Sequence, residues 1–143
     1  MRKNILFLLT LSFTMSASAS LPVHIEVNAY TTSYYPIKNR QLATHVYYLD
    51  QVELLEEQLS HHLSTNPQIA EAQIRQKMQS SAWKQTEQAL ADAYIGVTEG
   101  WKNGITKVPA ILFTDPETGK SAVIYGETDI AKALQFYQQH ENR

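Results

Sequence analysis

The side chains most suited to chemistry in this 143-residue chain are histidines and carboxylates, and no cysteine accompanies them. Without a thiol, the chain cannot perform thiol–disulfide exchange or hold an iron–sulfur cluster or a zinc thiolate site. His61 and His62 are adjacent, and neighbouring helix positions point about 100° apart, so both imidazoles cannot face one ion. No HExxH spacing occurs. The sequence therefore predicts no metal and no cofactor.

Other candidate groups also have simple structural explanations. His24 and His45 would meet only if their strands pair, and a half-exposed sheet face suits both equally well. The carboxylate pairs Glu56–Glu57 and Asp115–Glu117 fall on a predicted helix surface and in a predicted turn, where charges are solvated. Neither a G-x-S-x-G elbow nor a glycine-rich phosphate loop is present. We therefore expect a protein that is not an enzyme.

Residues 1–19 predict a secretory signal peptide that is cleaved after Ala19. Arg2 and Lys3 supply a positive start, residues 5–13 are mostly apolar, and Ala17–Ser18–Ala19 fits a cleavage signal. A membrane anchor is the alternative, but a spanning helix needs about 20 apolar residues, roughly twice the run available. We therefore expect a periplasmic protein with a single domain at 20–143 and no stable membrane insertion.

The remaining chain is acidic. Once Arg2 and Lys3 are removed, ten cations face fourteen acids, and the formal net charge is −4. A nucleic-acid partner calls for a basic patch, and none is evident, so we expect no nucleic-acid binding.

The first half of the mature chain predicts two strands and a helix. Residues 23–30 alternate between apolar and polar side chains, with Tyr30 on the polar side, and residues 44–49 are rich in β-branched and aromatic types. Residues 31–43 between them are loop-like. Asp50 then begins a helix, and Glu53 three positions later fits a capping box. The predicted buried stripe of this helix is Val52, Leu55, Leu59 and Leu63.

A long helical region follows. Pro67 takes a first helical position after Asn66 or Thr65, either of which can cap the helix. The helical pattern then continues to about Asn103, which predicts a break near Ser80–Ser81 or at Gly96. Gly104 provides the stop signal.

The last part of the chain predicts strand, turn, strand and helix. Apolar runs at 110–113 and 122–125 flank a segment with Asp115, Pro116 and Gly119, which predicts a β-hairpin with a longer loop. Thr128 can cap the final helix. The apolar residues that recur at helical spacing in it are Ile130, Ala131, Leu134 and Tyr137.

The full order predicts an α/β sandwich: a small mixed sheet of about four strands, helices between strands two and three, and a C-terminal helix. From Gly104, the pattern Gly-Ile-x-x-Val-Pro-Ala, with the hairpin and helix after it, resembles the C-terminal half of the thioredoxin fold. The resemblance implies a cis Val108–Pro109 bond that faces the functional site. Residues 31–43 barely reach the length of a helical crossover, so the first helix of that fold is expected to be a turn or missing.

In that fold the loop after the first strand carries the redox cysteines, and here it reads Thr-Thr-Ser-Tyr-Tyr-Pro at 31–36. One interpretation is that Tyr34 and Tyr35 cover a core edge. The other is that Tyr34, Tyr35, Val108 and Pro109 form a peptide-docking face, because tyrosine offers a large contact area with a polar tip.

The mature chain as a whole resembles the small exported proteins of integrating conjugative elements, a family of unknown function with thioredoxin-like character. The resemblance rests on segments from Tyr48–Leu49–Asp50 to Thr128–Asp129–Ile130 and is strongest at 104–134. It implies a non-catalytic periplasmic accessory in conjugative transfer and type IV secretion assembly, with other conjugation-apparatus proteins as partners. The alternative is a degenerate disulfide-isomerase-like chaperone without redox activity.

Overall fold

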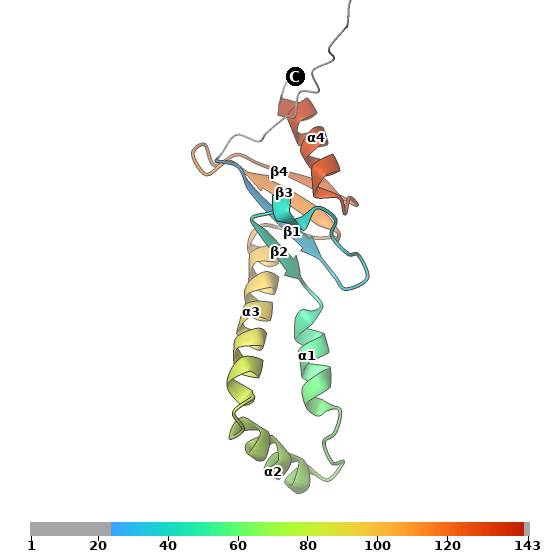
Figure 1. The fold of residues 1–143 in the computed structure, drawn as a ribbon, viewed down its shortest axis with the longest axis vertical. Helices are drawn as coiled ribbons and strands as arrows, with labels where there is room; N and C mark the ends of the chain where they lie inside the picture. Colours follow the sequence, from blue (N-terminus) through green and yellow to red (C-terminus); the bar gives the residue numbers. More distant parts are fainter. Residues whose placement is uncertain (1–23, 142–143) are drawn as a thin grey trace, which may run out of the picture.

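Four strands form one mixed sheet in the computed structural model, which describes residues 24–141. The strands are β1 (Glu26–Thr31), β2 (His45–Tyr48), β3 (Ala110–Thr114) and β4 (Ser121–Tyr125). Their order is β2-β1-β3-β4, with β1 parallel to β2 and β3 antiparallel to both β1 and β4 (Figure 1). The predicted mixed four-stranded sheet is confirmed, whereas the predicted signal peptide lies outside the described residues.

The β3–β4 hairpin forms where the apolar runs predict it. Ala110 pairs with Tyr125 at the open end of the hairpin, and Thr114 pairs with Ser121 next to the loop. Asp115 closes that loop, because its carboxylate accepts the Glu117 amide at 2.9 Å and the Thr118 hydroxyl at 2.8 Å.

The helix α4 (Ile130–Glu141) covers one face of the sheet and buries the larger core cluster. Phe113 on β3 stacks on Tyr137 of α4 with ring centroids 4.6 Å apart. The fully buried members of this cluster are Val27, Ala29, Ile111, Phe113, Ile130 and Ala133.

The predicted cap of α4 at Thr128 is wrong by one residue. Asp129 Oδ1 accepts the amides of Ala131 at 3.0 Å and Lys132 at 3.4 Å, which is the usual role of a capping side chain. The same oxygen accepts the side-chain amide of Asn39 at 2.8 Å. Asp129 therefore holds the helix start and the loop after β1 together.

Between β1 and β2, the only helical structure is the 3-10 turn η1 (Arg40–Leu42). The expectation that residues 31–43 contain a turn in place of a full helix is thus confirmed. The turn lies on the α4 side of the sheet, where Lys38 forms an isolated bridge with Asp129.

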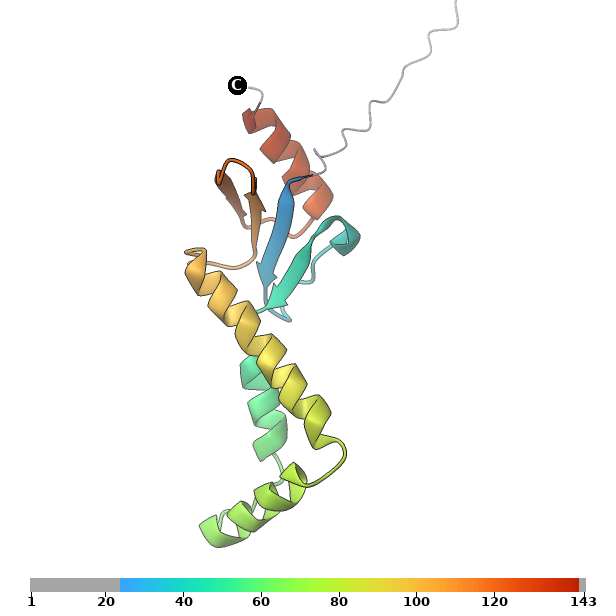
Figure 2. The ribbon, with the colours of Figure 1, turned by 90° about the vertical axis from the view of Figure 1, so that its left-hand side faces the viewer.

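Three helices between β2 and β3 form an arm that projects away from the sheet beyond the end of β2 (Figures 1 and 2). They are α1 (Gln51–Ser60), α2 (Pro67–Met78) and α3 (Trp83–Lys102). Asn66 caps α2, since its Oδ1 accepts the amides of Gln68 and Ile69, and Pro67 is the first helical residue, as predicted. The predicted break occurs at residues 79–82, and α3 continues unbroken through Gly96.

The predicted leucine stripe of α1 is only half-buried. None of the residues of α1 or α2 is fully buried, and α3 has its buried residues, Ala93, Gly96 and Gly100, in its second half. The arm is therefore anchored to the sheet at one end and is open to solvent along much of its length.

The second half of α3 covers the other face of the sheet and buries a smaller cluster of Tyr30, Ala110 and Leu112. Glycine permits the close approach: a Cβ on Gly96 would lie 3.2 Å from Tyr47 Cδ1, and one on Gly100 would lie 3.5 Å from Tyr30 Cδ1. α3 ends at Lys102, just before the predicted stop residue Gly104, whose φ is +66°; the Ile105 amide donates to the Gly100 carbonyl at 2.9 Å.

Candidate docking site

The loop after β1 is folded onto the end of that strand by its own hydrogen bonds. Thr31 is fully buried, and its hydroxyl donates to the Tyr35 carbonyl at 2.6 Å. The Tyr35 amide donates to the Thr32 carbonyl at 3.0 Å, which closes a turn with Ser33 and Tyr34 at its centre. The two tyrosines are therefore presented by a defined backbone.

Asp50 ties this loop to the start of α1. The amide and hydroxyl of Ser33 both donate to Asp50 Oδ2, at 2.9 and 2.6 Å. Burial by itself would raise the pKa of Asp50. The hydrogen bonds from Ser33 and from the backbone amide of Asp50 together outweigh burial, so the pKa is lowered below its usual value. The predicted capping box is wrong, because the Asp50 side chain accepts from the loop and makes no cap hydrogen bond.

The four residues predicted for the docking face differ in exposure. Tyr34 is 85% exposed and Tyr35 is 47% exposed, so Tyr34 does not cover a core edge. Val108 is half-buried against the smaller core cluster, and Pro109 is buried. The Val108–Pro109 bond is cis, as the resemblance predicts.

The sheet register brings Pro109 to the base of the tyrosine loop. Ala110 pairs with Tyr30, so Pro109, one residue earlier, stands beside Thr31, from which the loop departs. The Pro109 carbonyl accepts a hydrogen bond from the Gly126 amide, which directly follows β4, at 2.8 Å. The sheet thus places the loop and the proline next to each other, with the tyrosine side chains toward solvent.

Comparison with known protein families places the chain in one of them. The family described as "Protein of unknown function (DUF1525)" matches residues 24–143. The chain belongs to this family. No curated protein and no solved structure matches it. Within residues 24–141, no helix has both the length and the apolar character needed to cross a membrane.

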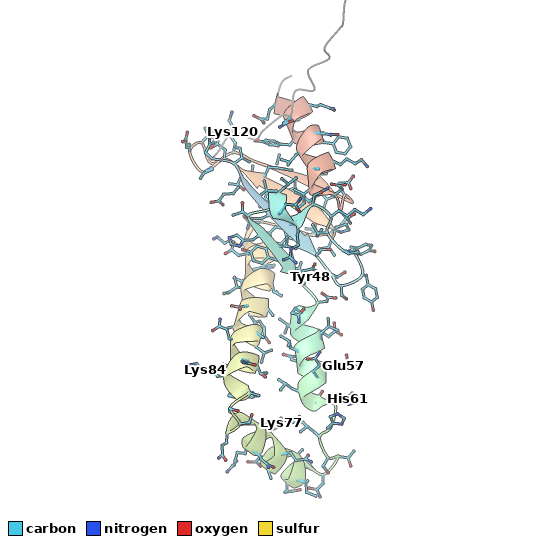
Figure 3. The ribbon with its side chains drawn as sticks, in the orientation of Figure 1. Tyr48, Glu57, His61, Lys77, Lys84 and Lys120 are labelled. Atoms are coloured by element: carbon cyan, nitrogen blue, oxygen red, sulfur yellow. The ribbon has the colours of Figure 1, made fainter. Side chains whose placement is uncertain are left out.

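In the described part of this DUF1525 chain, the histidines form no metal-binding cluster. His61 and His62 are exposed with their rings edge-on, and Figure 3 shows His61 and Glu57 on the side of α1 away from α3. His45 pairs with Asn28 in the sheet, so it does not face His24. Among residues 24–141, no three histidine, aspartate or glutamate side chains are placed to hold a metal ion.

Tyr30 is a buried residue whose burial the sequence pattern does not predict. Strict alternation puts it on the polar side of β1, yet its ring is fully buried and stacks on Tyr47 at 5.3 Å. Its hydroxyl accepts the Asn103 side-chain amide at 3.1 Å, and burial is the main cause that raises its pKa to about 12. The glycines at 96 and 100 were the available signal, because their spacing marks a helix face that can approach an aromatic layer closely.

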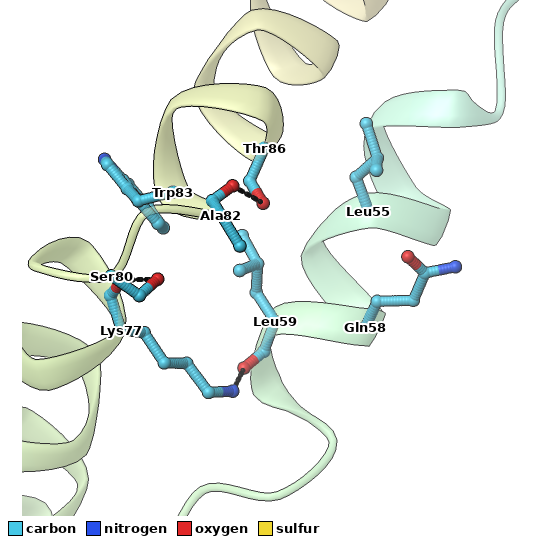
Figure 4. A pocket seen from close by; sticks show the side chains of 8 residues that line it. All are labelled: Leu55, Gln58, Leu59, Lys77, Ser80, Ala82, Trp83 and Thr86. Carbon is cyan, nitrogen blue, oxygen red and sulfur yellow. Dashed lines mark hydrogen bonds between the residues drawn. The ribbon is translucent and has the colours of Figure 1, made fainter.

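A hollow in the helical arm was also not predicted (Figure 4). Its volume is about 300 Å³, and Lys77 bridges its floor by donating to the Leu59 carbonyl at 2.8 Å. That contact satisfies a carbonyl near the C-terminal end of α1 and joins α2 to α1. The other residues around the hollow are Leu55, Gln58, Ser80, Ala82, Trp83 and Thr86.

Proposed function

We propose that this chain is a non-catalytic accessory protein of an integrating conjugative element, which works in the periplasm and contributes to conjugative transfer or type IV secretion assembly by binding other proteins. The resemblance of its mature segments to small exported proteins of such elements supports the context. The expected signal peptide at residues 1–19 supports the compartment.

The proposal includes a thioredoxin-like domain without the redox cysteines. Support comes from the strand order β2-β1-β3-β4, the parallel β1–β2 pair, the β3–β4 hairpin and the C-terminal helix on one face. On this view the three-helix arm replaces the simpler connection that normally joins the two halves of the fold, and the chain at 31–36 takes the place of the redox loop.

The observation that carries a binding function is the exposure of Tyr34 on a fixed turn. A tyrosine side chain that is 85% exposed contributes nothing to the core, while the loop beneath it is held by Thr31 and Asp50. An aromatic ring on a rigid turn loses little conformational entropy when a partner covers it, which favours binding. Val108, which is half-buried, would supply adjoining apolar surface, and the buried Pro109 would support the base of the loop from the neighbouring strand.

Affinity purification from cells that carry the element tests this function. The protein and its Tyr34→Ser/Tyr35→Ser variant are tagged identically, and co-purified proteins and the frequency of conjugative transfer are compared. Trp101→Ser is the matched control, because Trp101 is equally exposed, at 87%, but lies at the end of α3. We expect the tyrosine variant alone to lose conjugation-apparatus partners and to lower transfer. Unchanged partners and transfer in that variant would refute the proposal.

A chaperone without redox activity is the second candidate, and a different surface favours it. The second half of α3 exposes several large apolar side chains, which an unfolded client could cover; they are Tyr94, Ile95, Val97 and Trp101. Suppression of aggregation of a reduced client protein measures this activity. The two functions are separable, because Trp101→Ser should weaken chaperoning and leave specific partner binding intact.

A further inference from the structure

β2 forms a free edge of the sheet. Within the described residues only β1 pairs with it, so the backbone groups along its other side have no strand partner. The strand contains neither proline nor a carboxylate, lysine or arginine, the residues that commonly protect such edges. β4, at the other edge, follows directly after Lys120, which provides a charge of that protective kind.

A hollow of about 300 Å³ opens beside β2. Ala89, Ala93 and Gly96 share one face of α3 and line one side of it. Gly96 packs against Tyr47, so it is the small side chain of the half-buried Ala89 that leaves space for a side chain from outside. Tyr48, which Figure 3 places where β2 leads into α1, lines the other side. The remaining residues around this groove, which we call the β2 groove, are Val46, Tyr47, Gln51 and Asp92.

The β2 groove is acidic. Asp92 is exposed and accepts a hydrogen bond from the neutral Gln88 side chain at 2.9 Å, and no salt bridge within residues 24–141 involves it. Burial raises the pKa of Tyr47, and the carboxylates of Glu99 and Glu26 raise it further, so the strand lies in a negative field. A cationic group is therefore favoured beside the groove.

We propose that the β2 edge binds an extended peptide strand of a partner protein, with an aliphatic side chain in the β2 groove and a lysine or arginine beside Asp92. Main-chain hydrogen bonds to β2 supply affinity in such strand addition, and the groove and the carboxylate supply selectivity. The helical arm projects away from the sheet beyond the end of β2 (Figures 1 and 2), and such a projection next to the edge opposes edge-to-edge pairing of two whole sheets. This binding does not depend on the proposed docking face.

Binding of a defined probe to the purified protein tests the proposal. The probe is a labelled eight-residue peptide that alternates threonine with valine or lysine, so that valine and lysine share one face of the extended chain. In the second peptide glutamate replaces lysine, and in the third the lysine peptide is N-methylated at alternate residues. We expect the lysine peptide to bind at least about tenfold more tightly than either of the others, and to protect β2 amides from hydrogen exchange.

Two pairs of variants locate the site. Ala89→Trp fills the groove and should abolish binding, whereas the control Ala91→Trp, at an exposed position outside the groove, should not. Asp92→Lys should reverse the preference between the lysine and glutamate peptides, whereas Glu87→Lys should leave it unchanged. Equal binding of the N-methylated peptide, or binding that survives Ala89→Trp, would overturn the proposal. A dimer in sedimentation that Ala89→Trp dissociates would also overturn it, since a second copy would then occupy the edge.

Discussion

Replacement of Gly100 by alanine should stabilise the protein, whereas the same replacement at Gly96 should destabilise it. Both glycines lie inside α3, where alanine is favoured over glycine by about 1 kcal/mol. At Gly100 the new Cβ would lie 3.5 Å from Tyr30 and 3.6 Å from Leu49, which are ordinary contact distances. The free energy of unfolding of Gly100→Ala should therefore rise by about 1 kcal/mol.

At Gly96 the contacts are too close for that gain to survive. A Cβ there would lie 3.2 Å from Cδ1 and 3.3 Å from Cβ of Tyr47. The Tyr47 Cβ is fixed by the β2 backbone, and its ring stacks on Tyr30 and on His45 with centroids 5.3 and 5.7 Å apart, so a shift away from Gly96 would disturb both stacking contacts. Overpacking of this kind costs about 1–3 kcal/mol, so after subtraction of the helix gain of about 1 kcal/mol the net loss lies between about zero and about 2 kcal/mol.

Thermal and urea unfolding of the two variants beside the wild type measures these differences. For a domain of this size, 1 kcal/mol corresponds to a change in Tm of about 3–6 °C, so the two variants should differ by several degrees in opposite directions from the wild type. Because the chemical change is identical, the comparison isolates the packing of α3 against β2. Equal stabilisation by Gly96→Ala and Gly100→Ala would show that α3 does not pack closely against Tyr47 and would refute the reasoning.

Two further predictions concern local contacts. Asp50→Asn should lower stability at pH 7 by on the order of 1 kcal/mol, because the carboxylate bonds to Ser33 are lost. Since the pKa of Asp50 is lowered in the folded state, the difference in free energy of unfolding between the wild type and the variant should be full above about pH 4 and shrink as the pH falls further. Urea unfolding of both proteins from pH 7 to pH 3 measures this difference, and a difference that does not change with pH contradicts the prediction. Asn66→Ala should cost about 1 kcal/mol by uncapping α2, whereas the control Asn103→Ala should leave amide exchange in α2 unchanged.

The local parts of the fold were predictable because their signals lie within a few residues of one another. Asn66–Pro67 marks a helix start by side-chain capping and a preset φ, and Gly104 marks a helix stop by its left-handed backbone. The β3–β4 hairpin follows from two apolar runs and the turn residues between them. None of these features needs a contact from a distant part of the chain.

The errors arose where a distant residue competes with a local partner. Asp50 and Glu53 have capping-box spacing, but Ser33, seventeen positions earlier, takes the Asp50 carboxylate. Tyr30 obeys the alternation of β1, but α3 covers that face of the sheet as well, so a position predicted to be polar is buried. For the proposed docking face, the tyrosines and the proline were proposed from the sequence alone, whereas the anchoring of the loop by Asp50 and Thr31 required the tertiary structure.

Asp50 links the two surfaces proposed for binding. Its carboxylate holds Ser33 at the base of the tyrosine turn, and its backbone leads directly into Gln51, which lines the β2 groove. The parallel β1–β2 pair makes this proximity unavoidable, because both strands end at the same side of the sheet. A partner that adds a strand to β2 and continues past its end would therefore reach the loop that presents Tyr34. Loosening of that loop by Asp50→Asn should then weaken a partner that spans both surfaces more than the short peptide that contacts only the groove.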